Sequence, residues 1–296
     1  MPMPALSLVA MPGRRLKTLE LATEMEARGF QGIFGPSFGD VLSLCLSVGH
    51  VTERIPFGSA IQPIYSRPAA DLAATASYLA EVSGGRFHLG LGVSHGPMHE
   101  RLGVQVGRPL ADTRSYVETI KAVIGDAPRP PIVLATLRSK MLQLAVEIAD
   151  GAVWANGSRS YLPGQLRAAG VPDGFFVGNM VPTVIDDDRA AARAVNRKTL
   201  TGYVALPNYR NYWKEAGYVE EMEGIERALE AGDRDAVATY MTDEWLDDCT
   251  LSGSATEVRD GVEAWFDAGA TMPIVVPSST SGGQLKAIEE IFAAYA

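Results

Sequence analysis

Hydrophobic residues follow two alternating patterns along the chain. Short apolar runs, typical of strands buried on both faces, are followed by segments in which apolar residues recur every three or four positions, as on one face of a helix. This alternation persists over most of the 296 residues. It predicts eight strands, at residues 6–11, 29–34, 56–64, 86–91, 130–136, 150–156, 174–185 and 272–278.

The number of these units favours a (β/α)8 barrel, also called a TIM barrel. Eight strands separated by amphipathic helices over this length fit that fold, and a doubly wound sheet is the main alternative. The alternation is broken by a tyrosine-rich, acidic and mostly helical segment at residues 207–249. We therefore expect one barrel domain over residues 1–296, with an insertion at roughly 206–250 after the seventh strand.

Composition and charge narrow the classes of partner. The chain has 26 Lys and Arg against 35 Asp and Glu, a net charge of -9, and no basic run that would suggest nucleic acid or an anionic membrane. No apolar run reaches the roughly 20 residues that span a bilayer. The first 15 residues carry their basic pair after the apolar part, the reverse of a signal peptide. A cytoplasmic protein acting on small molecules is expected.

Cysteines and histidines give little support for a metal site. Cys45 and Cys249 are far apart in the sequence and form no CxxC motif, so neither a disulfide framework nor a zinc site is indicated. His95 and His99 are four residues apart, but Pro97 lies between them and argues against a helix there, and no motif such as HExxH is present. We expect no bound metal. His88, inside a strand, is expected to be structural.

In a TIM barrel the active site lies at the carboxyl ends of the strands. These positions are rich in Gly, Pro, Ser and Thr and contain no Ser-His-Asp or Cys-His arrangement. Gly90 and Gly92 are followed by Gly96, which does not match the GxGxxG dinucleotide fingerprint, so they are expected only to let the backbone turn. Arg138 and Lys140 lie at an expected helix start, a position suited to binding a phosphate. The alternative is that both side chains only lie on a solvated face of that helix.

Three segments carry a family resemblance. They are GSAIQPIYSRPAADLAATASYLAEVSGGRFHLGLGVS (58–94), PPIVLATLRSKMLQLAVEIADGAVWAN (130–156) and SGSATEVRDGVEAWFDAGAT (252–271). Together they resemble the bacterial luciferase-like monooxygenase family, in the branch of oxidoreductases that depend on coenzyme F420, a deazaflavin. The resemblance runs over nearly the whole chain and implies the same barrel.

The resemblance also implies a cofactor site, for coenzyme F420 or alternatively for FMN. Gln62-Pro63 matches the turn where relatives have a cis peptide against the flavin ring, and a proline in second position makes a cis bond less costly. The end of strand four lines the cofactor, and the turn after strand five binds its phosphate. The residues implied are Gln62, Pro63, Gly92, Val93, Ser94, Thr136, Leu137, Arg138, Ser139, Lys140, Trp154 and Asn156.

His95 is the expected catalytic residue. It falls where some relatives place an acid near the hydride-accepting carbon, and an imidazole with a pKa near ~6.5 can donate or accept a proton there. Many relatives end strand two with Asp-His, whereas this chain has Ser37-Phe38, so one expected acid is missing. Phe38, Tyr65 and Trp154 are candidate walls of an apolar substrate pocket, with ordinary core packing as the alternative.

These features favour an oxidoreductase that transfers hydride between coenzyme F420 and a small organic substrate. One alternative is an FMN-dependent monooxygenase that activates oxygen. Another is a non-catalytic protein that binds a flavin or a deazaflavin, in line with the missing acid at Ser37-Phe38. Relatives are often dimers, so the resemblance implies a homodimer, although no interface can be located in the sequence.

Overall fold

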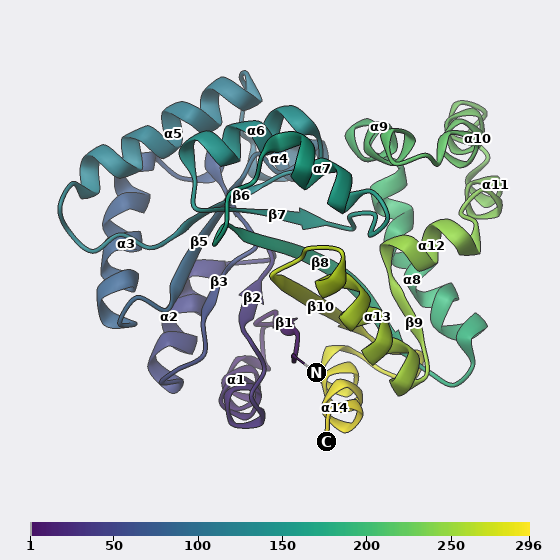
Figure 1. Cartoon of the computed structure of the whole chain (residues 1–296), viewed down its shortest axis with the longest axis horizontal. Coiled ribbons are helices and arrows are strands. Elements are labelled where there is room, and N and C mark those ends of the chain that lie inside the picture. The colour runs from purple at the N-terminus through teal and green to yellow at the C-terminus, as the bar shows by residue number, and fades with distance from the viewer. Residues whose placement is uncertain (1) are drawn as a thin grey trace. The chain divides into compact units, whose positions relative to one another are not determined.

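The predicted alternation of strands and helices is present in the structure, and the fold is a (β/α)8 barrel (Figure 1). The computed structural model describes residues 2–296. Its sheet has the strand order β10-β1-β2-β3-β5-β6-β7-β8-β9, with a further pairing between β8 and β10, and β4 pairs with β5. The strands are β1 (Ala5–Ser7), β2 (Ile33–Gly35), β3 (Phe57–Ser59), β4 (Gln62–Pro63), β5 (Phe87–Gly92), β6 (Ile132–Ala135), β7 (Gly151–Ala155), β8 (Phe176–Ile185), β9 (Leu251–Gly253) and β10 (Met272–Ser278).

The chain forms two compact units. The N-terminal unit contains Pro2–Trp154 and Ala169–Gly178, and the C-terminal unit contains Ala155–Ala168 and Asn179–Ala296. The helices are α1 (Arg15–Arg28), α2 (Val41–Val51), α3 (Ala69–Val82), α4 (Gly96–Leu102), α5 (Pro109–Ile124), α6 (Ser139–Ile148), α7 (Leu162–Ala169), α8 (Arg189–Val204), α9 (Pro207–Glu215), α10 (Val219–Glu230), α11 (Arg234–Thr239), α12 (Asp243–Cys249), α13 (Ala255–Asp267) and α14 (Gln284–Ala294).

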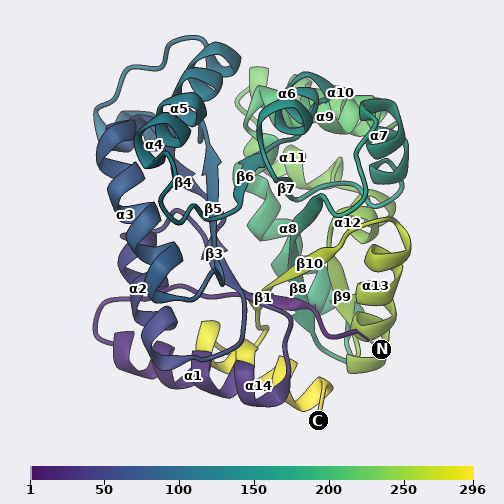
Figure 2. The same ribbon diagram turned by 60° about the vertical axis from the view of Figure 1, so that its left-hand side comes forward.

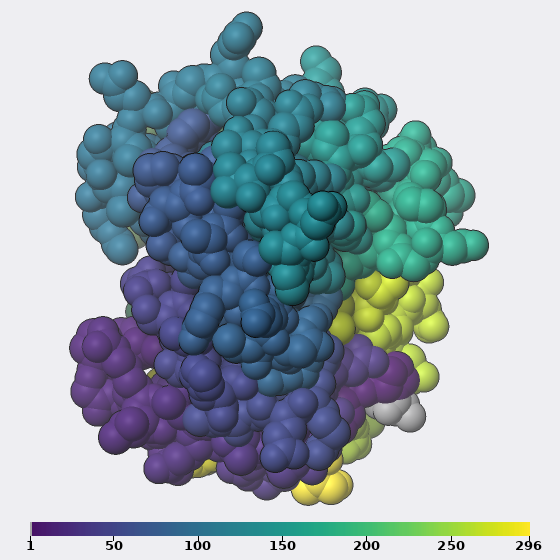
Figure 3. Space-filling model, turned by 90° about the vertical axis from the view of Figure 1, so that its left-hand side faces the viewer, coloured from purple at the N-terminus to yellow at the C-terminus, as the bar shows by residue number. Residues whose placement is uncertain are grey.

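In the N-terminal unit, parallel strands are covered by helices on their outer side. Registers such as Leu6 opposite Ile33 and Leu89 opposite Ile132 show the parallel pairing. The helices α2, α3 and α5 lie next to one another over β3 and β5 (Figure 2). The outer face of these N-terminal segments, purple to blue, is shown in Figure 3. Apolar side chains of the strands are fully buried, as expected for strands covered on both faces.

The glycines of β5 allow two strands to approach closely. A Cβ atom added at Gly90 would lie 1.8 Å from the carbonyl oxygen of Ser59 on β3. The Ser59 hydroxyl bonds both to the N–H of Gly90, at 3.0 Å, and to its carbonyl oxygen, at 2.8 Å. Gly90 is therefore required by packing between β3 and β5.

The α2–β3 turn of the N-terminal unit is held by a carboxylate on α1. Glu26 accepts hydrogen bonds from the backbone N–H groups of Glu53, Arg54 and Ile55, at 2.6 to 3.1 Å. Burial by itself would raise the pKa of Glu26, but these N–H donors lower it, and its pKa lies below the ordinary value. The charged carboxylate therefore stabilises the folded chain.

We expect Glu26→Gln to lower the free energy of unfolding by about 1 to 2 kcal/mol at neutral pH, because hydrogen bonds to a charged acceptor are stronger than those to a neutral one. Since the folded pKa is lowered, this contribution is complete above the unfolded pKa and is lost as the pH falls through the folded pKa. Urea unfolding at pH 7 and in acid should thus show the difference from wild type shrinking in acid.

Glu24→Gln is the matched control for this prediction, because Glu24 pairs with the partly exposed Arg28 on the same helix, at 2.7 Å. Such pairs contribute about 0.3 to 0.5 kcal/mol. Equal losses in the two variants, or a loss at Glu26 that does not change with pH, would contradict the assigned role of this carboxylate.

In the C-terminal unit, β9 pairs in parallel with the end of β8, with Thr183 opposite Leu251. Ion pairs join α8 to α12: Arg193 contacts Asp243 at 2.8 Å and Asp247 at 2.5 Å, and Arg197 contacts Asp243 at 2.7 Å. The segment expected as an insertion forms the helices α9 to α12. They are grouped with α8 in Figure 1.

One helix start differs from the sequence-based expectation. The expectation of no helix around Pro97 is wrong, because α4 begins at Gly96 and has its proline in the first turn, where a missing N–H costs no hydrogen bond. The next helix, α5, begins with Pro109 and has Asp112 in its first turn. The Asp112 carboxylate accepts a hydrogen bond from Tyr65.

The third strand also differs from its expected form. Residues 56–64 form two short strands, β3 and β4, and the cis peptide bond joins Ala60 to Ile61 instead of Gln62 to Pro63. Gln62 and Pro63 are extended and pair with Leu91 and Gly92 of β5. The pairing of β4 with β5 therefore holds Gln62 and Pro63, where the cis bond was expected, in an extended conformation. The three-residue strand β9 was too short to be predicted from the apolar pattern.

Candidate functional site

The end of the third strand brings Gln62 and Pro63 next to the end of β5. Pro63 pairs with Gly92, so these expected cofactor residues are neighbours in the N-terminal unit. Gln62 is buried, and its amide donates to the Ser66 hydroxyl at 2.8 Å, while Ser66 donates to the carbonyl oxygen of Pro63 at 2.8 Å. These bonds order the turn that leads into α3.

The loop that follows β5 is held in an unusual backbone conformation. Ser94 has φ of 62°, in the left-handed region that non-glycine residues seldom adopt. A ring nitrogen of His99 contacts the carbonyl oxygen of Val93, and Tyr65 packs edge-on against His99 with ring centroids 5.8 Å apart. His99 therefore orders the loop. Strained residues such as Ser94 cluster at functional sites.

Tyr65 continues this network to α5. Its hydroxyl donates to Asp112 at 2.8 Å. Burial, and then the hydrogen bond to Asp112 and its charge, raise the pKa of Tyr65 to about 12. Tyr65 is thus a neutral hydrogen-bond donor at physiological pH, and its ring supports the β5 loop.

His95 lies at the N-cap of α4 with a ring that is partly buried. Its Nδ1 is buried and has no hydrogen-bond partner in residues 2–296. Burial, together with the charge of His99, lowers the pKa of His95 below its ordinary value. The imidazole is therefore neutral near pH 7 and has a buried nitrogen available to a bound molecule.

The turn after β6 leads directly into α6. Thr136 is buried, and its N–H donates to the carbonyl oxygen of Val153 at 2.9 Å. Arg138 is the N-cap of α6, no side chain caps the first turn, and Arg138, Ser139 and Lys140 are exposed. An uncapped helix start with two cations is suited to a phosphate.

The end of β7 carries Trp154 and Asn156. Trp154 is fully buried in the N-terminal unit, and its indole N–H has no partner among the described residues. Asn156, in the C-terminal unit, has φ of 58° and is also buried. Trp154 is therefore a buried donor with an unmet hydrogen bond, which in a native structure calls for an explanation, whereas the Asn156 side chain bonds to Tyr203.

Residues 156–160, the β7 loop, are fixed by their backbone amides. The N–H of Asn156 donates to the carbonyl oxygen of Met180, and that of Arg159 donates to the carbonyl oxygen of Asp248. The three other N–H groups donate to side chains, with distances of 2.8 to 3.1 Å: Gly157 to Asn179, Ser158 to Tyr212 and Ser160 to Asp248. The β7 loop is thus rigid.

Two of these partners lie on helices α9 and α12: Tyr212 is on α9 and Asp248 is on α12. Trp213, also on α9, donates its indole N–H to the carbonyl oxygen of Asn156 at 3.2 Å. Trp213 is itself fixed by an edge-on contact with Trp245, whose ring centroid is 4.8 Å away. Helices α9 and α12 therefore position the β7 loop within the C-terminal unit.

Sequence reasoning missed Asn179. It lies within β8, is 1% exposed and accepts the hydrogen bond from Gly157 described above. The signal that was available is its polarity: it interrupts the apolar run GFFVGNMVPTVI at residues 174–185. A polar residue in the middle of a buried strand needs a partner.

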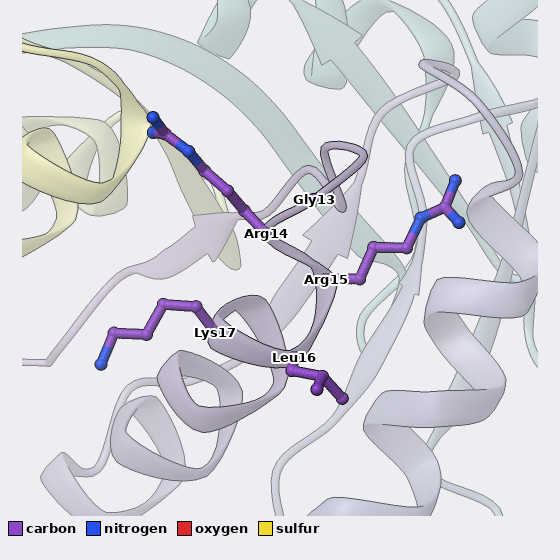
Figure 4. Close-up of a pocket in the computed structure, with 5 residues that line it drawn as sticks. All are labelled: Gly13, Arg14, Arg15, Leu16 and Lys17. Carbon is purple, nitrogen blue, oxygen red and sulfur yellow. The ribbon is translucent and has the colours of Figure 1, made fainter.

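A surface hollow lies between β1 and α1, lined by Gly13, Arg14, Arg15, Leu16 and Lys17. Figure 4 shows the side chains of Arg14, Arg15 and Lys17 pointing away from one another. The three cations do not converge on one ligand, so we assign no site to this hollow.

Within residues 2–296, no three His, Cys, Asp or Glu side chains are grouped as metal ligands would be. No helix in the same residues combines the length and the apolar character needed to cross a membrane.

Comparisons with known proteins identify relatives. The profile of the luciferase-like monooxygenase family matches residues 9–272. A Mycobacterium tuberculosis protein, named as a coenzyme F420-dependent oxidoreductase, is 27% identical over 318 residues, with 88% of this chain and 90% of that protein covered. A 5,10-methylenetetrahydromethanopterin reductase of Archaeoglobus fulgidus is 26% identical over 286 residues, with 85% of each chain covered.

Solved structures share the fold. The coenzyme F420-dependent tetrahydromethanopterin reductase of Methanopyrus kandleri superposes with a TM-score of 0.75 at 18% identity, covering 99% of this chain and 100% of that chain. The oxygenating component of a Baeyer-Villiger monooxygenase from Pseudomonas putida, in complex with FMN, has a TM-score of 0.62 at 17% identity, covering 93% and 91%.

Proposed function

The chain belongs to the luciferase-like monooxygenase family, and we propose that it is an oxidoreductase that transfers hydride between coenzyme F420 and a small organic substrate. The observation that carries this proposal is the neutral, partly buried His95 beside a strained turn at the end of β5. Relatives named for coenzyme F420 support the choice of cofactor.

The residues at the start of α6 fit the phosphate of such a cofactor. The helix has no side-chain cap, so its first amide groups can donate to phosphate oxygens, and Arg138 and Lys140 add positive charge. The Thr136 hydroxyl lies in the same turn. When bound, the deazaflavin supplies the hydride donor or acceptor, and the protein supplies position, electrostatics and the exclusion of water.

His95 supplies the proton chemistry in this proposal. In its neutral form the imidazole accepts the proton that a substrate hydroxyl loses when the substrate is oxidised, and in the reverse direction the imidazolium returns it. Gly92, Val93 and Ser94 lead into this residue, and Gln62 and Pro63 line the neighbouring turn. Ser37-Phe38, at the end of the second strand, offers no carboxylate or imidazole for this role.

Fluorescence titration with FMN, riboflavin and coenzyme F420 tests which cofactor binds and whether the start of α6 binds its phosphate. We expect coenzyme F420 to bind, and we expect Arg138→Gln/Lys140→Gln to weaken its binding at least tenfold, because a hydrogen bond to a charged group is worth about 1.5 to 3 kcal/mol. If FMN binds, the same double variant should weaken FMN but not riboflavin, which lacks the phosphate.

Arg54→Gln/Lys198→Gln is the matched control, since it removes two exposed cations elsewhere. Tight binding of FMN without binding of coenzyme F420 would instead favour an FMN-dependent monooxygenase, as in the FMN-bound relative of the fold. Tight binding of coenzyme F420 without turnover on any of a panel of small alcohols and aldehydes would favour a binding protein. Equal weakening of FMN and riboflavin would refute the phosphate site.

A further inference from the structure

The direction of the His95 imidazole is set by the backbone on both sides of this residue. On the helix side, His95 is the N-cap of α4, and its carbonyl oxygen accepts from the N–H groups of Met98, at 2.9 Å, and His99, at 3.1 Å. On the strand side it follows Ser94, whose φ of 62° is left-handed. A change in the Ser94 turn would therefore rotate His95 relative to the end of β5.

The Ser94 turn is imposed by contacts outside it. A non-glycine residue keeps a left-handed φ only where its surroundings hold it there. His99 supplies such a contact, since a nitrogen of its ring meets the carbonyl oxygen of Val93, the residue before Ser94. A carbonyl oxygen only accepts, so this nitrogen carries the hydrogen. The bond fixes the peptide plane between Val93 and Ser94, which is one side of the φ torsion of Ser94.

The ring of His99 is in turn fixed by Tyr65. The two rings meet edge-on, with centroids 5.8 Å apart and planes at 89°. The Tyr65 hydroxyl donates to Asp112 of α5 at 2.8 Å and accepts from the backbone N–H of Gly107. Tyr65 is therefore tied at its hydroxyl and packs on His99 with its ring.

The loop between α4 and α5 is fitted to this arrangement. A Cβ atom added at Gly107 would lie 2.5 Å from the Oδ2 of Asp112, so the carboxylate occupies the space that a side chain at position 107 would need. Residues 93–112 and Tyr65 all belong to the N-terminal unit. The contacts therefore run from α5 through Tyr65 and His99 to the end of β5 within one unit.

His99 also acts on the charge of His95. It lies one helical turn beyond His95, and burial and then the charge of His99 lower the pKa of His95. From other elements, Tyr65 and its partner Asp112 face His99. Tyr65 is neutral, because its pKa is raised to about 12. His99 thus both holds the turn before His95 and disfavours the protonated form of His95.

We propose that Tyr65 and His99 are positioning residues for proton transfer by His95, because together they impose the Ser94 turn that directs its imidazole. The proposal rests on the function proposed above, in which His95 moves the proton. Neither side chain has to touch the substrate or the cofactor in this role. Tyr65, expected from the sequence as a wall of the substrate pocket, then acts through His99 instead.

Turnover with coenzyme F420 gives the first test. His99→Leu removes the donor to Val93 and should lower kcat about 10- to 100-fold, the range expected when a reacting group is misplaced by up to about 1 Å. His99→Gln keeps an N–H donor and should recover most of this loss. Tyr65→Phe keeps the ring on His99 but loses the bond to Asp112, and it should lower kcat by a smaller factor than His99→Leu.

A double-mutant cycle separates positioning from a general structural role. If His99 acts through His95, adding His99→Leu to His95→Gln should lower kcat by less than about twofold, whereas a side chain that only stabilises the fold would lower kcat by the same factor in both backgrounds. His50→Leu and Tyr78→Phe, which change exposed side chains, are the matched controls and should leave kcat unchanged.

NMR of the chain without cofactor gives a readout that does not depend on turnover. In His99→Gln the charge is gone while the burial of His95 remains, so the pKa of His95 should rise towards its ordinary value. The acidic limb of substrate oxidation should then move to higher pH, because the neutral imidazole is the proton acceptor. Tyr65→Phe should shift the ring resonances of His95 and His99, and Tyr78→Phe should leave both in place.

The outcomes separate this inference from the proposed function. A normal kcat in His95→Gln would refute the proposed role of His95, and this inference with it. Loss of kcat in His95→Gln, with equal effects of His99→Leu in both backgrounds, would overturn this inference alone. So would a titration and ring resonances of His95 that stay unchanged in His99→Gln and Tyr65→Phe, a result that requires neither a folded His99→Leu nor a known substrate.

Discussion

Replacing His95 by glutamine will lower kcat by about 100- to 10,000-fold and leave the Kd of the cofactor within about twofold, as expected for loss of a general acid or base. Glutamine keeps the polarity and approximate size of the side chain but cannot take up a proton near neutral pH. The partly buried ring of His95 is neutral because burial and the charge of His99 lower its pKa. The measurement is the absorbance change of coenzyme F420 with a panel of small alcohols.

The pH dependence of the same reaction follows from the direction of the pKa shift. Because the pKa of His95 is lowered, the neutral form persists below the ordinary value of about 6.5. Substrate oxidation, which needs a proton acceptor, should stay constant from neutral pH down to that value and fall only below it. This acidic limb should be absent in His95→Gln.

His50→Gln is the matched control, because His50 lies exposed in the last turn of α2. It should change neither kcat nor the pH profile. The four histidines of the chain also permit a direct titration by NMR, in which His95 should titrate below the ordinary value. A normal kcat in His95→Gln, or a large loss of cofactor affinity, would show that His95 does not transfer the proton.

The barrel could be predicted because its main signals are local. Apolar runs and helical periodicity gave the order of strands and helices, and β10 begins and ends at the predicted residues. The errors arose where tertiary contacts override local preference. Strand β9 has three residues and exists through its pairing with β8, and α4 tolerates Pro97 because the proline falls in its first turn.

The candidate site could be predicted only in part. The carboxyl ends of the strands follow from the fold, and the resemblance pointed to Gln62, Ser94 and Asn156 before any geometry was known. The left-handed φ values of Ser94 and Asn156 were not predictable, since serine and asparagine adopt them only when surrounding contacts impose them. Asn179 was missed because a strand pattern reports burial and not which buried amide lacks a partner.

Gly90→Ala will destabilise the folded chain by about 3 kcal/mol or more, which is at the upper end of the range for overpacked sites. The added Cβ would lie 1.8 Å from the carbonyl oxygen of Ser59, and a backbone atom in a paired strand cannot move aside as a flexible side chain can. Relief would require β3 and β5 to separate, which would also break the two bonds of the Ser59 hydroxyl to Gly90. Urea unfolding measures the loss.

Gly202→Ala is the same substitution at a site where the opposite effect on stability is expected, and it serves as the control. Gly202 lies inside α8 with no atom within 4 Å of an added Cβ, so alanine there should stabilise the chain by up to about 1 kcal/mol through helix propensity. If Gly90→Ala and Gly202→Ala had similar effects, close packing of β3 on β5 would not be the reason for Gly90. Because β3 and β5 lead to Gln62 and to His95, a tolerated Gly90→Ala should also lower cofactor affinity by displacing both strand ends.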